Sequence, residues 1–295
     1  MPPTSSSARR SMSADIPAGA PRRSTAVTAG TAAAVGADPE RDGRVEVVAL
    51  VGLPEIVPGN DLGRLVGDAL DRTQDLLPLR PDDVLVVTQK IVSKAEGAIV
   101  DLTGVEPRPE AVAFGERWDR DPRQVEVVLR EARRIVRMER GVIITETEHG
   151  FVCANGGIDA SNVGPASGSI VTLLPHDPDA SAASIRTAIH ERFGVDVPVI
   201  VSDSFGRPWR WGITDVAIGV SGLIPIEDLR GMPDADGRIM KSTIRASADE
   251  IASAAELALG KLAGRPVAVV RGARPLLGEG SIREALMPSE FDLFG

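Results

Sequence analysis

The sequence is poor in residues that bind soft metals or form covalent cross-links. Its 295 residues include one cysteine, Cys153, and three histidines. One cysteine cannot form an internal disulfide, and no cluster of cysteine and histidine offers the ligands of a structural zinc site. No stretch reaches the roughly 18 consecutive apolar residues of a membrane-spanning helix. We therefore expect a protein of the reducing cytoplasm, without a disulfide, a zinc site or a membrane span.

Two widespread nucleotide-binding patterns are also missing. The chain has no GxxxxGK[ST] segment and no GxGxxG segment that opens a helix after a strand, so we expect neither a P-loop NTPase nor a Rossmann dehydrogenase. The formal net charge is -9, which argues against nucleic-acid binding through neutralised phosphates. An anionic substrate therefore needs a local positive site.

The first 43 residues differ from the rest in composition. They consist mainly of Ala, Ser, Thr, Pro, Gly and Arg and contain little that could anchor a core, so we expect a disordered tail. Arg22 and Arg23 mimic a twin-arginine export signal, but the segment after them has no Leu, Ile or Phe and is barely hydrophobic. Residues 44–295 are long enough for one large domain, possible subdomains included.

Apolar patterning predicts several strands and helices within residues 44–295. We expect strands over residues 45–52, 83–89, 197–203, 215–222 and 266–272, and a hairpin that joins residues 141–146 to 151–155. We expect helices over residues 61–70, 123–138, 179–193 and 247–260. Their predicted N-terminal caps are Asn60 or Asp61 for the first, Asp179 for the third, and a capping box of Ser247 and Glu250 for the fourth. Because hairpin and crossover connections are mixed, the expected class is α+β or mixed α/β.

Two predicted strands end in carboxylates. Asp159 follows FVCANGGI, and Asp203 follows VPVIVS and is itself followed by Ser204. Mg²⁺ and Mn²⁺ prefer hard oxygen ligands, and a few carboxylates together with substrate phosphates are enough to hold them. If the two loops converge, they form a metal-assisted phosphate site. The alternative is that each aspartate caps or begins a turn, which is a common role of Asp.

We expect a loop over residues 204–212, SFGRPWRWG, which concentrates cationic and aromatic side chains. Arg207 and Arg210 flank a Pro-Trp pair, and guanidinium groups fixed in this way suit phosphate or carboxylate. The alternative is a solvated arginine pair that packs on tryptophan. Trp209 and Trp211 are two of the three tryptophans in the chain, which indicates a shaped pocket or an interface.

Two lysines in the segment TQKIVSKAEG are further candidates for phosphate binding. Lys90 and Lys94 could reach a phosphate as point charges, although lysines on a surface helix are usually only solvated. Cys153 lies inside an apolar strand and is interpreted as a core residue. The residues alone thus predict a metal-assisted phosphate site in an acidic protein, without naming the reaction.

Six sequence motifs, taken together, resemble those of a known enzyme family. They are GLPEIVPGNDL, VTQKIVSKAEG, NGGIDASNV, VSDSFGRPWRWGITDVAIGVSG, ADEIASAAELALGK and VAVVRGARPLLGEGS. In this order and spacing they closely resemble the coenzyme F-420 gamma-glutamyl ligase family, over roughly residues 45 to 282. The pairing of GIDASN with SDSFGRPWR is far more specific than either motif alone.

The resemblance implies a reaction and its requirements. Members of this family use GTP to join L-glutamate to the deazaflavin precursor F-420-0 through an acyl phosphate, releasing GDP and phosphate, and then add further glutamates by gamma linkage. The implied cofactors are Mg²⁺ or Mn²⁺, with two ions in each site, and K⁺. The implied assembly is an intertwined homodimer of mixed α/β subunits, here in a single-domain form.

The resemblance also implies the site residues. Asp159, Asp203 and Ser204 match metal ligands, and Ser204 stands where relatives often have Thr. The implied GTP-binding residues are Leu53, Pro54, Glu55, Ile56, Gln89, Lys90, Lys94, Asn162, Leu259, Gly260, Lys261, Leu262, Ala263 and Gly264. We add Arg207 and Arg210 to Asp159 and Asp203 as catalytic candidates. A metal-dependent phosphohydrolase that uses the same aspartates, and a non-enzymatic nucleotide- or deazaflavin-binding module, are the alternatives.

Overall fold

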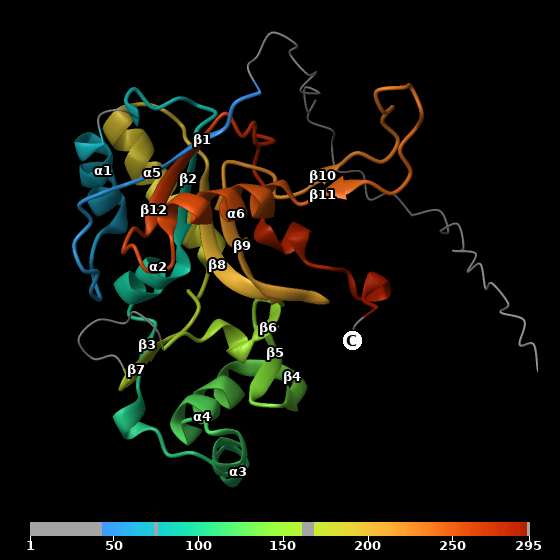
Figure 1. The fold of residues 1–295 in the computed structure, drawn as a ribbon. Helices are drawn as coiled ribbons and strands as arrows, with labels where there is room; N and C mark the ends of the chain where they lie inside the picture. The colour runs from blue at the N-terminus through green and yellow to red at the C-terminus, as the bar shows by residue number, and fades with distance from the viewer. Residues whose placement is uncertain (1–42, 74–75, 161–167, 294–295) are drawn as a thin grey trace, which may run out of the picture. The chain divides into compact units, whose positions relative to one another are not determined.

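The computed structural model of the protein describes residues 43–73, 76–160 and 168–293. Its largest sheet has five strands in the order β1-β12-β2-β8-β9 (Figure 1). In that order, the strands span Glu46–Ala49, Val267–Arg271, Val84–Thr88, Val199–Arg207 and Arg210–Ser221. β2 and β8 are parallel, whereas the other neighbouring pairs are antiparallel. The one parallel pair therefore ends at a single edge of the sheet.

The central strands of this sheet are covered on both faces. Residues 84–87 of β2 and 267–270 of β12 are all buried, and such continuous apolar runs are typical of strands between two layers of helices. The helices α1 (Leu62–Arg72) and α5 (Pro178–Phe193) lie on one side, and α6 (Ser247–Leu259) lies on the other (Figure 1). The main core of the protein is formed between these layers.

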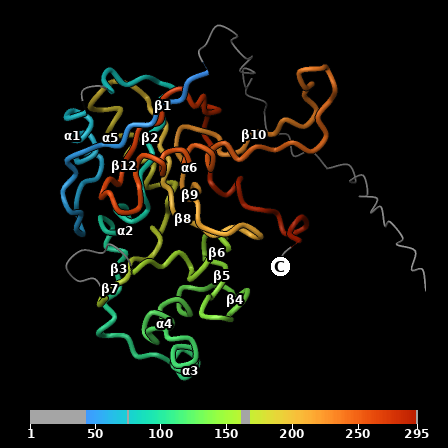
Figure 2. The backbone as a smooth tube through the Cα atoms, in the orientation of Figure 1, coloured from blue at the N-terminus to red at the C-terminus, as the bar shows by residue number. Residues whose placement is uncertain are grey.

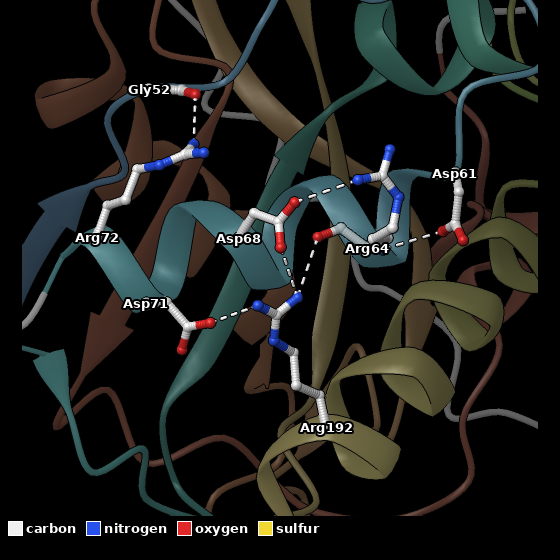
Figure 3. Close-up of polar contacts among 7 residues, drawn as sticks. All are labelled: Gly52, Asp61, Arg64, Asp68, Asp71, Arg72 and Arg192. Atoms are coloured by element: carbon white, nitrogen blue, oxygen red, sulfur yellow. Dashed lines mark hydrogen bonds and ion pairs between the residues drawn. The ribbon is translucent and has the colours of Figure 1, made fainter.

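Helices α1 and α5 are fastened together by close packing and by ion pairs. A Cβ atom on Gly63 of α1 would lie 2.3 Å from the Cβ atom of Ala188 on α5, so only glycine permits this approach. Arg192 of α5 donates to Asp68 at 2.8 Å and also bonds to Asp71, both on α1 (Figure 3). Because these pairs are partly exposed, we assign most of the stability of this contact to packing.

A second group of elements lies beyond the edge of the sheet at which β2 and β8 end (Figure 1). It contains the helices α3 (Pro109–Trp118) and α4 (Pro122–Glu131), which pack with a small sheet of β4 (Ala132–Glu139), β5 (Val142–Thr147) and β6 (Val152–Ala154). In the same group, β3 (Ile99–Asp101) pairs with β7 (Ile170–Thr172).

The remaining elements are α2 (Gln89–Glu96), β10 (Glu227–Asp228) and β11 (Ile244–Arg245), with short 3-10 turns at Leu102–Gly104, Asn155–Gly157, Ile282–Ala285 and Ser289–Phe291.

Most predicted elements are confirmed. The five predicted strands correspond to β1, β2, β8, β9 and β12, and the predicted hairpin corresponds to β5 and β6. The side chain of Asp61 accepts a hydrogen bond from the backbone of Arg64 at 2.9 Å, so it caps α1 as expected. The fold is mixed α/β, as predicted. Apart from Gly43, the predicted tail lies outside the described residues.

The predicted helix over residues 123–138 is wrong in its second half. Helix α4 ends at Glu131, and the chain continues directly as strand β4 from Ala132. β4 pairs with β5, which gives its backbone groups hydrogen-bond partners outside its own segment. Ile135 and Val136 are β-branched and favour a strand. The apolar spacing alone was compatible with both structures, and the pairing with β5 decided between them.

Two predicted helix caps are also wrong. Asp177, not Asp179, caps α5 by accepting from the backbone of Ala180 at 3.0 Å, and Pro178 takes the first helical position, where its missing N–H is harmless. Asp179 instead accepts from the backbone of Val220 at 2.7 Å. Ser247 is the first residue of α6 rather than its cap.

The segment between residues 203 and 215, predicted as a loop, continues both strands. β8 runs on to Arg207 and β9 starts at Arg210, so the two strands form one long antiparallel hairpin. Figure 2 shows this hairpin, in yellow and orange, extending past α6. Glycine, proline and arginine in this segment suggested a loop, but strand pairing overrides such local preferences.

No helix in the described part of the chain combines the length and the apolar character that a membrane crossing needs.

A buried carboxylate holds helices α3 and α4 in place. Glu126 of α4 is 3% exposed, and both of its oxygens accept hydrogen bonds from Arg108, at 2.9 and 3.0 Å. Arg130 adds a hydrogen bond at 2.7 Å. These donors, with Arg108 first, lower the pKa of Glu126 to about 2. The ionised form is therefore strongly preferred in the folded state.

We predict that Glu126→Gln lowers the free energy of unfolding at pH 7 by about 1.5–3 kcal/mol, the range for hydrogen bonds to a charged group. Because the folded pKa lies below the ordinary value, this contribution is complete above pH 4.5 and is lost as the pH falls towards 2. Urea unfolding of the wild type and the variant at pH 7 and pH 3 measures the gap. Glu116→Gln, on the exposed face of α3, is the control and should change little. An equal gap at both pH values would contradict the prediction.

Candidate functional site

A cavity of about 350 Å³ lies where the parallel pairing of β2 with β8 ends, at Thr88 and Ser202. These two strands are parallel neighbours, and α/β proteins bind their ligands beyond the carboxyl ends of such strands. The cavity is lined by Leu53, Pro54, Glu55, Ile56, Thr88, Gln89, Lys90, Ile91, Lys94, Asp159, Ser202, Asp203, Ser204, Asp215, Glu256, Leu259, Gly260, Lys261, Leu262, Gly264, Arg265 and Pro266. The sheet therefore brings together segments that are far apart in the sequence.

The first turn of α2 forms one wall of the cavity. The chain passes from β2 to α2 without a loop, so Gln89 and Lys90 lie in the first turn of the helix. Backbone N–H groups of a first turn lack partners within the helix and favour anions. Gln89 is buried and donates to the carbonyl of Leu173 at 2.8 Å, which anchors this end of the helix. The wall thus combines a fixed backbone with a positive local field.

Lys90 and Lys94 are not solvated lysines on a surface helix. The Nζ atom of Lys90 lies 2.7 Å from a carboxylate oxygen of Asp159, and that of Lys94 lies 2.6 Å from Glu55. The two lysine side chains are only 17% and 8% exposed. Each pair therefore joins α2 to another wall of the cavity. The structure decides against the solvated reading for both residues.

The segment that contains Glu55 is held in place from α1. Arg72, in the last turn of α1, donates to the carbonyl of Gly52 at 2.8 Å (Figure 3). Gly52 has a φ of 78°, a conformation that suits glycine, and it directly precedes the lining residues Leu53 and Pro54. Helix α1 thus fixes the start of this wall.

A chain of hydrogen bonds links β8, β9 and the loop after α6. The backbone of Ser204 donates to Asp203 at 2.8 Å, and its hydroxyl donates to Asp215 at 2.7 Å. The Nζ atom of Lys261 donates to the same hydroxyl at 2.8 Å. Ser202 donates to the second oxygen of Asp215 at 3.1 Å. Negative and positive groups thus face each other in one connected network.

Burial raises the pKa of Asp203 to about 7. This value includes a smaller upward contribution from the nearby carboxylates of Asp159 and Asp215. The N–H of Ser204 and the charge of Lys261 lower the pKa and so oppose the shift. An ionised Asp203 is therefore held close to like charges in a poorly solvated place. A bound cation would relieve this repulsion.

Two carboxylates in the cavity were not identified from the sequence. Asp215 pairs with Ser204 across the β8–β9 hairpin, and Glu256 comes from α6. Burial, followed by the charge of Asp215, raises the pKa of Glu256. The position of Asp215 could have been found only by extending both strands through residues 204–212. Glu256 lies in an alanine-rich helix, and no sequence signal distinguished it from a solvated residue.

Most of the predicted site residues line this cavity. They include Asp159, Asp203, Ser204 and all implied GTP-binding residues except Asn162 and Ala263. Asn162 lies outside the described residues, and Ala263 is not among the lining residues. Arg207 and Arg210 face each other across the tip of the hairpin, are exposed and do not line the cavity, so their catalytic role stays a prediction.

The donor set of the cavity fits a hard divalent cation. Among the described residues, no group of three or more His, Cys, Asp and Glu side chains is arranged to hold a metal by itself. Asp159, Asp203 and the hydroxyl of Ser204 supply three oxygens, and Mg²⁺ typically uses one or two carboxylates and completes its shell with phosphate oxygens and water. The site therefore suits a metal that arrives with a phosphate ligand.

We predict that Asp203→Asn stabilises the metal-free protein at pH 8. The folded pKa of Asp203 exceeds its ordinary value of 3.8, so the folded state loses stability as the pH rises from about 4 to about 7. The amide removes this loss, and the stability of the variant relative to the wild type should therefore be higher at pH 8 than at pH 5. Unfolding in EDTA at both pH values measures the difference. The same relative stability at both values would refute the prediction.

The sequence is similar to a known family and to several named proteins. Residues 51–272 match the family described as F420-0:Gamma-glutamyl ligase. The chain is 41% identical over 254 residues to the Coenzyme F420:L-glutamate ligase of Methanothermobacter thermautotrophicus, which covers 85% of this chain and 98% of that protein. It is 46% identical over 224 residues to the protein of the same name from Methanopyrus kandleri, covering 76% and 85%.

A third relative, from Methanocaldococcus jannaschii, carries the same name. It is 42% identical over 218 residues, which are 74% of this chain and 86% of that protein. The matched residues contain every residue that lines the cavity, whereas β1 lies just before them. The chain therefore belongs to the F420-0:Gamma-glutamyl ligase family.

Proposed function

We propose that this protein joins L-glutamate to the deazaflavin precursor F-420-0 with GTP as the energy source, and then adds further glutamates by gamma linkage. Membership of the ligase family supports the reaction class. The observation that carries the proposal for the site is the meeting of two aspartates and a serine with three lysines in one cavity, at the ends of the parallel strands. This combination suits a metal-bound phosphate.

The reaction needs two steps, because a carboxylate is not attacked by an amine at a useful rate. In the first, an oxygen of the terminal carboxylate of the precursor attacks the γ-phosphorus of GTP, and GDP leaves. In the second, the amino nitrogen of glutamate attacks the carbonyl carbon of the acyl phosphate, phosphate leaves, and the nitrogen loses a proton. The products are an amide, GDP and phosphate.

The residues of the cavity have distinct proposed roles in these steps. Asp159, Asp203 and Ser204 would hold the divalent ions, Mg²⁺ or Mn²⁺. When bound, the metal neutralises charge on phosphate oxygens and aligns the transferring group. Lys90 and Lys261 carry positive charge at the same place, and each already contacts a proposed metal ligand. They would stabilise the charge on the phosphoryl oxygens during transfer.

The proposed GTP site follows the walls of the cavity. Residues 53–56, the first turn of α2 with Lys94, and the segment 259–264 after α6 enclose the space beside the metal ligands. The first turn of α2 is suited to the phosphates. We also propose that K⁺ is required, which omission of K⁺ from the assay tests directly.

We propose that the protein acts as a homodimer. The tip of the β8–β9 hairpin exposes Trp209, Trp211 and Ile213, with 85%, 103% and 60% of their surfaces accessible. Large apolar side chains gathered in this way are typical of an interaction site. Arg207 and Arg210 share this tip and lie away from the cavity of their own chain. They would reach a phosphate or carboxylate only in the site of a second subunit.

Phosphate release from GTP tests the reaction. We expect the purified protein with Mn²⁺ or Mg²⁺ to release phosphate only when F-420-0 and L-glutamate are both present, with a product heavier by whole glutamyl units. Asp159→Ala and Asp203→Ala should each lower the rate about 100-fold or more, because metal stabilisation of phosphoryl transfer contributes several kcal/mol. Glu116→Gln is the matched control and should retain the wild-type rate.

The other outcomes separate the alternatives. Release without glutamate and without a gain in product mass would identify a phosphohydrolase. Binding of GTP without release, even with both other substrates, would identify a nucleotide-binding module. Either result would reject the ligase proposal.

The hairpin tip gives a separate test of the dimer. We expect a dimer in size-exclusion chromatography with light scattering, and the double variant Trp209→Ser with Trp211→Ser should shift the population to monomers and lower ligase activity. The exposed Leu257 on α6 is the control, because Leu257→Ser removes a similar apolar surface elsewhere. A wild-type monomer with full activity would overturn the proposal.

A further inference from the structure

Asp215 is the most buried carboxylate of the cavity. It is 3% exposed, and its two oxygens accept hydrogen bonds from the hydroxyls of Ser204 and Ser202, at 2.7 and 3.1 Å. Its backbone carbonyl accepts a third hydrogen bond, at 2.7 Å, from Ser253 of α6. Asp215 is therefore fixed by two neighbouring elements, β8 and α6.

The position of Asp215 follows from strand pairing. Ser204 and Asp215 lie directly opposite each other in the β8–β9 hairpin, where Cβ atoms are typically about 4.5–5.5 Å apart. Ser202 lies two residues before Ser204 and so points to the same face of the strand. One carboxylate can therefore bind both hydroxyls. This contact is built into the register of the hairpin.

The partners of Ser204 determine the direction of its O–H bond. A serine hydroxyl has one hydrogen and two lone pairs, whereas an ammonium group can only donate. Lys261 donates to this oxygen at 2.8 Å, so the hydrogen of Ser204 must point to the acceptor on its other side, which is Asp215. One lone pair accepts from Lys261, and the second is left for a ligand in the cavity.

We infer that Asp215 is a positioning residue that keeps the Ser204 hydroxyl oriented as an acceptor towards the metal. The inference rests on the proposed function, in which Ser204 is a metal ligand. Without Asp215, the hydroxyl could rotate, and its hydrogen could occupy the direction that the metal needs. Residues behind a metal ligand orient it in this way, and their replacement typically lowers metal affinity roughly 10- to 100-fold.

The test measures binding of Mn²⁺ to the full chain, without and with saturating inorganic phosphate, by the electron paramagnetic resonance signal of the free ion. The variants are Ser204→Ala, Asp215→Ala and the double variant with both changes. We expect each single variant to bind Mn²⁺ roughly 10-fold or more weakly. In the double variant we expect no further loss beyond that of Ser204→Ala, because a residue that acts only through Ser204 has nothing left to orient.

Asp249→Ala is the matched control. Asp249 lies on α6 and accepts a hydrogen bond from the backbone of Ala217 in β9, at 2.9 Å, but it does not line the cavity. It should leave Mn²⁺ affinity unchanged. Asp215→Asn serves if Asp215→Ala does not fold, as judged by circular dichroism. The amide has one acceptor for two hydroxyls, so we expect a smaller loss that also disappears in the Ser204→Ala background.

Each contrary result has a distinct meaning. An equal loss with and without the Ser204 hydroxyl would show that Asp215 acts directly on the metal, and it would overturn the inference. Unchanged affinity in Asp215→Ala would overturn it as well. If the wild type binds no Mn²⁺ even with phosphate present, the proposed metal site itself is wrong and the inference fails with it.

Discussion

The parallel pairing of β2 with β8 is the constraint on which the site depends. In this register Thr88 lies beside Ser202, where β2 and the parallel pairing end while β8 continues. The chain then enters α2 directly on one side and reaches Asp203 and Ser204 on the other. A shift by one residue would turn these side chains to the opposite face. The fully buried strands around the pair make such a shift costly.

Charge is concentrated at this edge and balanced within it. Three lysines of the cavity each contact an oxygen of another segment: Lys90, Lys94 and Lys261. Each of the three therefore also links two walls of the cavity. An acidic chain with a net charge of -9 can hold an anion only by such local arrangement. Burial raises the pKa of Asp203, and the carboxylates of Asp159 and Asp215 add to the rise while the charge of Lys261 opposes it. The site is therefore matched to a ligand that brings both a cation and phosphate oxygens.

The sequence was informative where a local pattern had a single structural solution. Long apolar runs such as β2 and β12 could form only buried strands, and short motifs gave Asp159 and Asp203 as neighbours in the site. Residues 132–138, 204–207 and 210–212 were assigned wrongly, because their conformation is set by pairing with another strand. Asp215 was missed for the same reason, since its partner Ser204 is identified only by the register of the hairpin. The sequence also could not show whether Lys90 and Lys94 are solvated or line the site, because these two possibilities differ only in tertiary contacts.

The tip of the β8–β9 hairpin combines a turn of unusual composition with exposed apolar side chains. Trp209 has a φ of 54°, a left-handed conformation that a bulky side chain adopts at a free-energy cost. Its side chain is also 85% exposed, so the single chain recovers little apolar burial in return. Strain of this kind persists where function requires it. Arg207 and Arg210 stand at this tip and do not line the cavity. The proposed homodimer would therefore use the same hairpin in two sites, with its base in its own cavity and its tip in that of the partner.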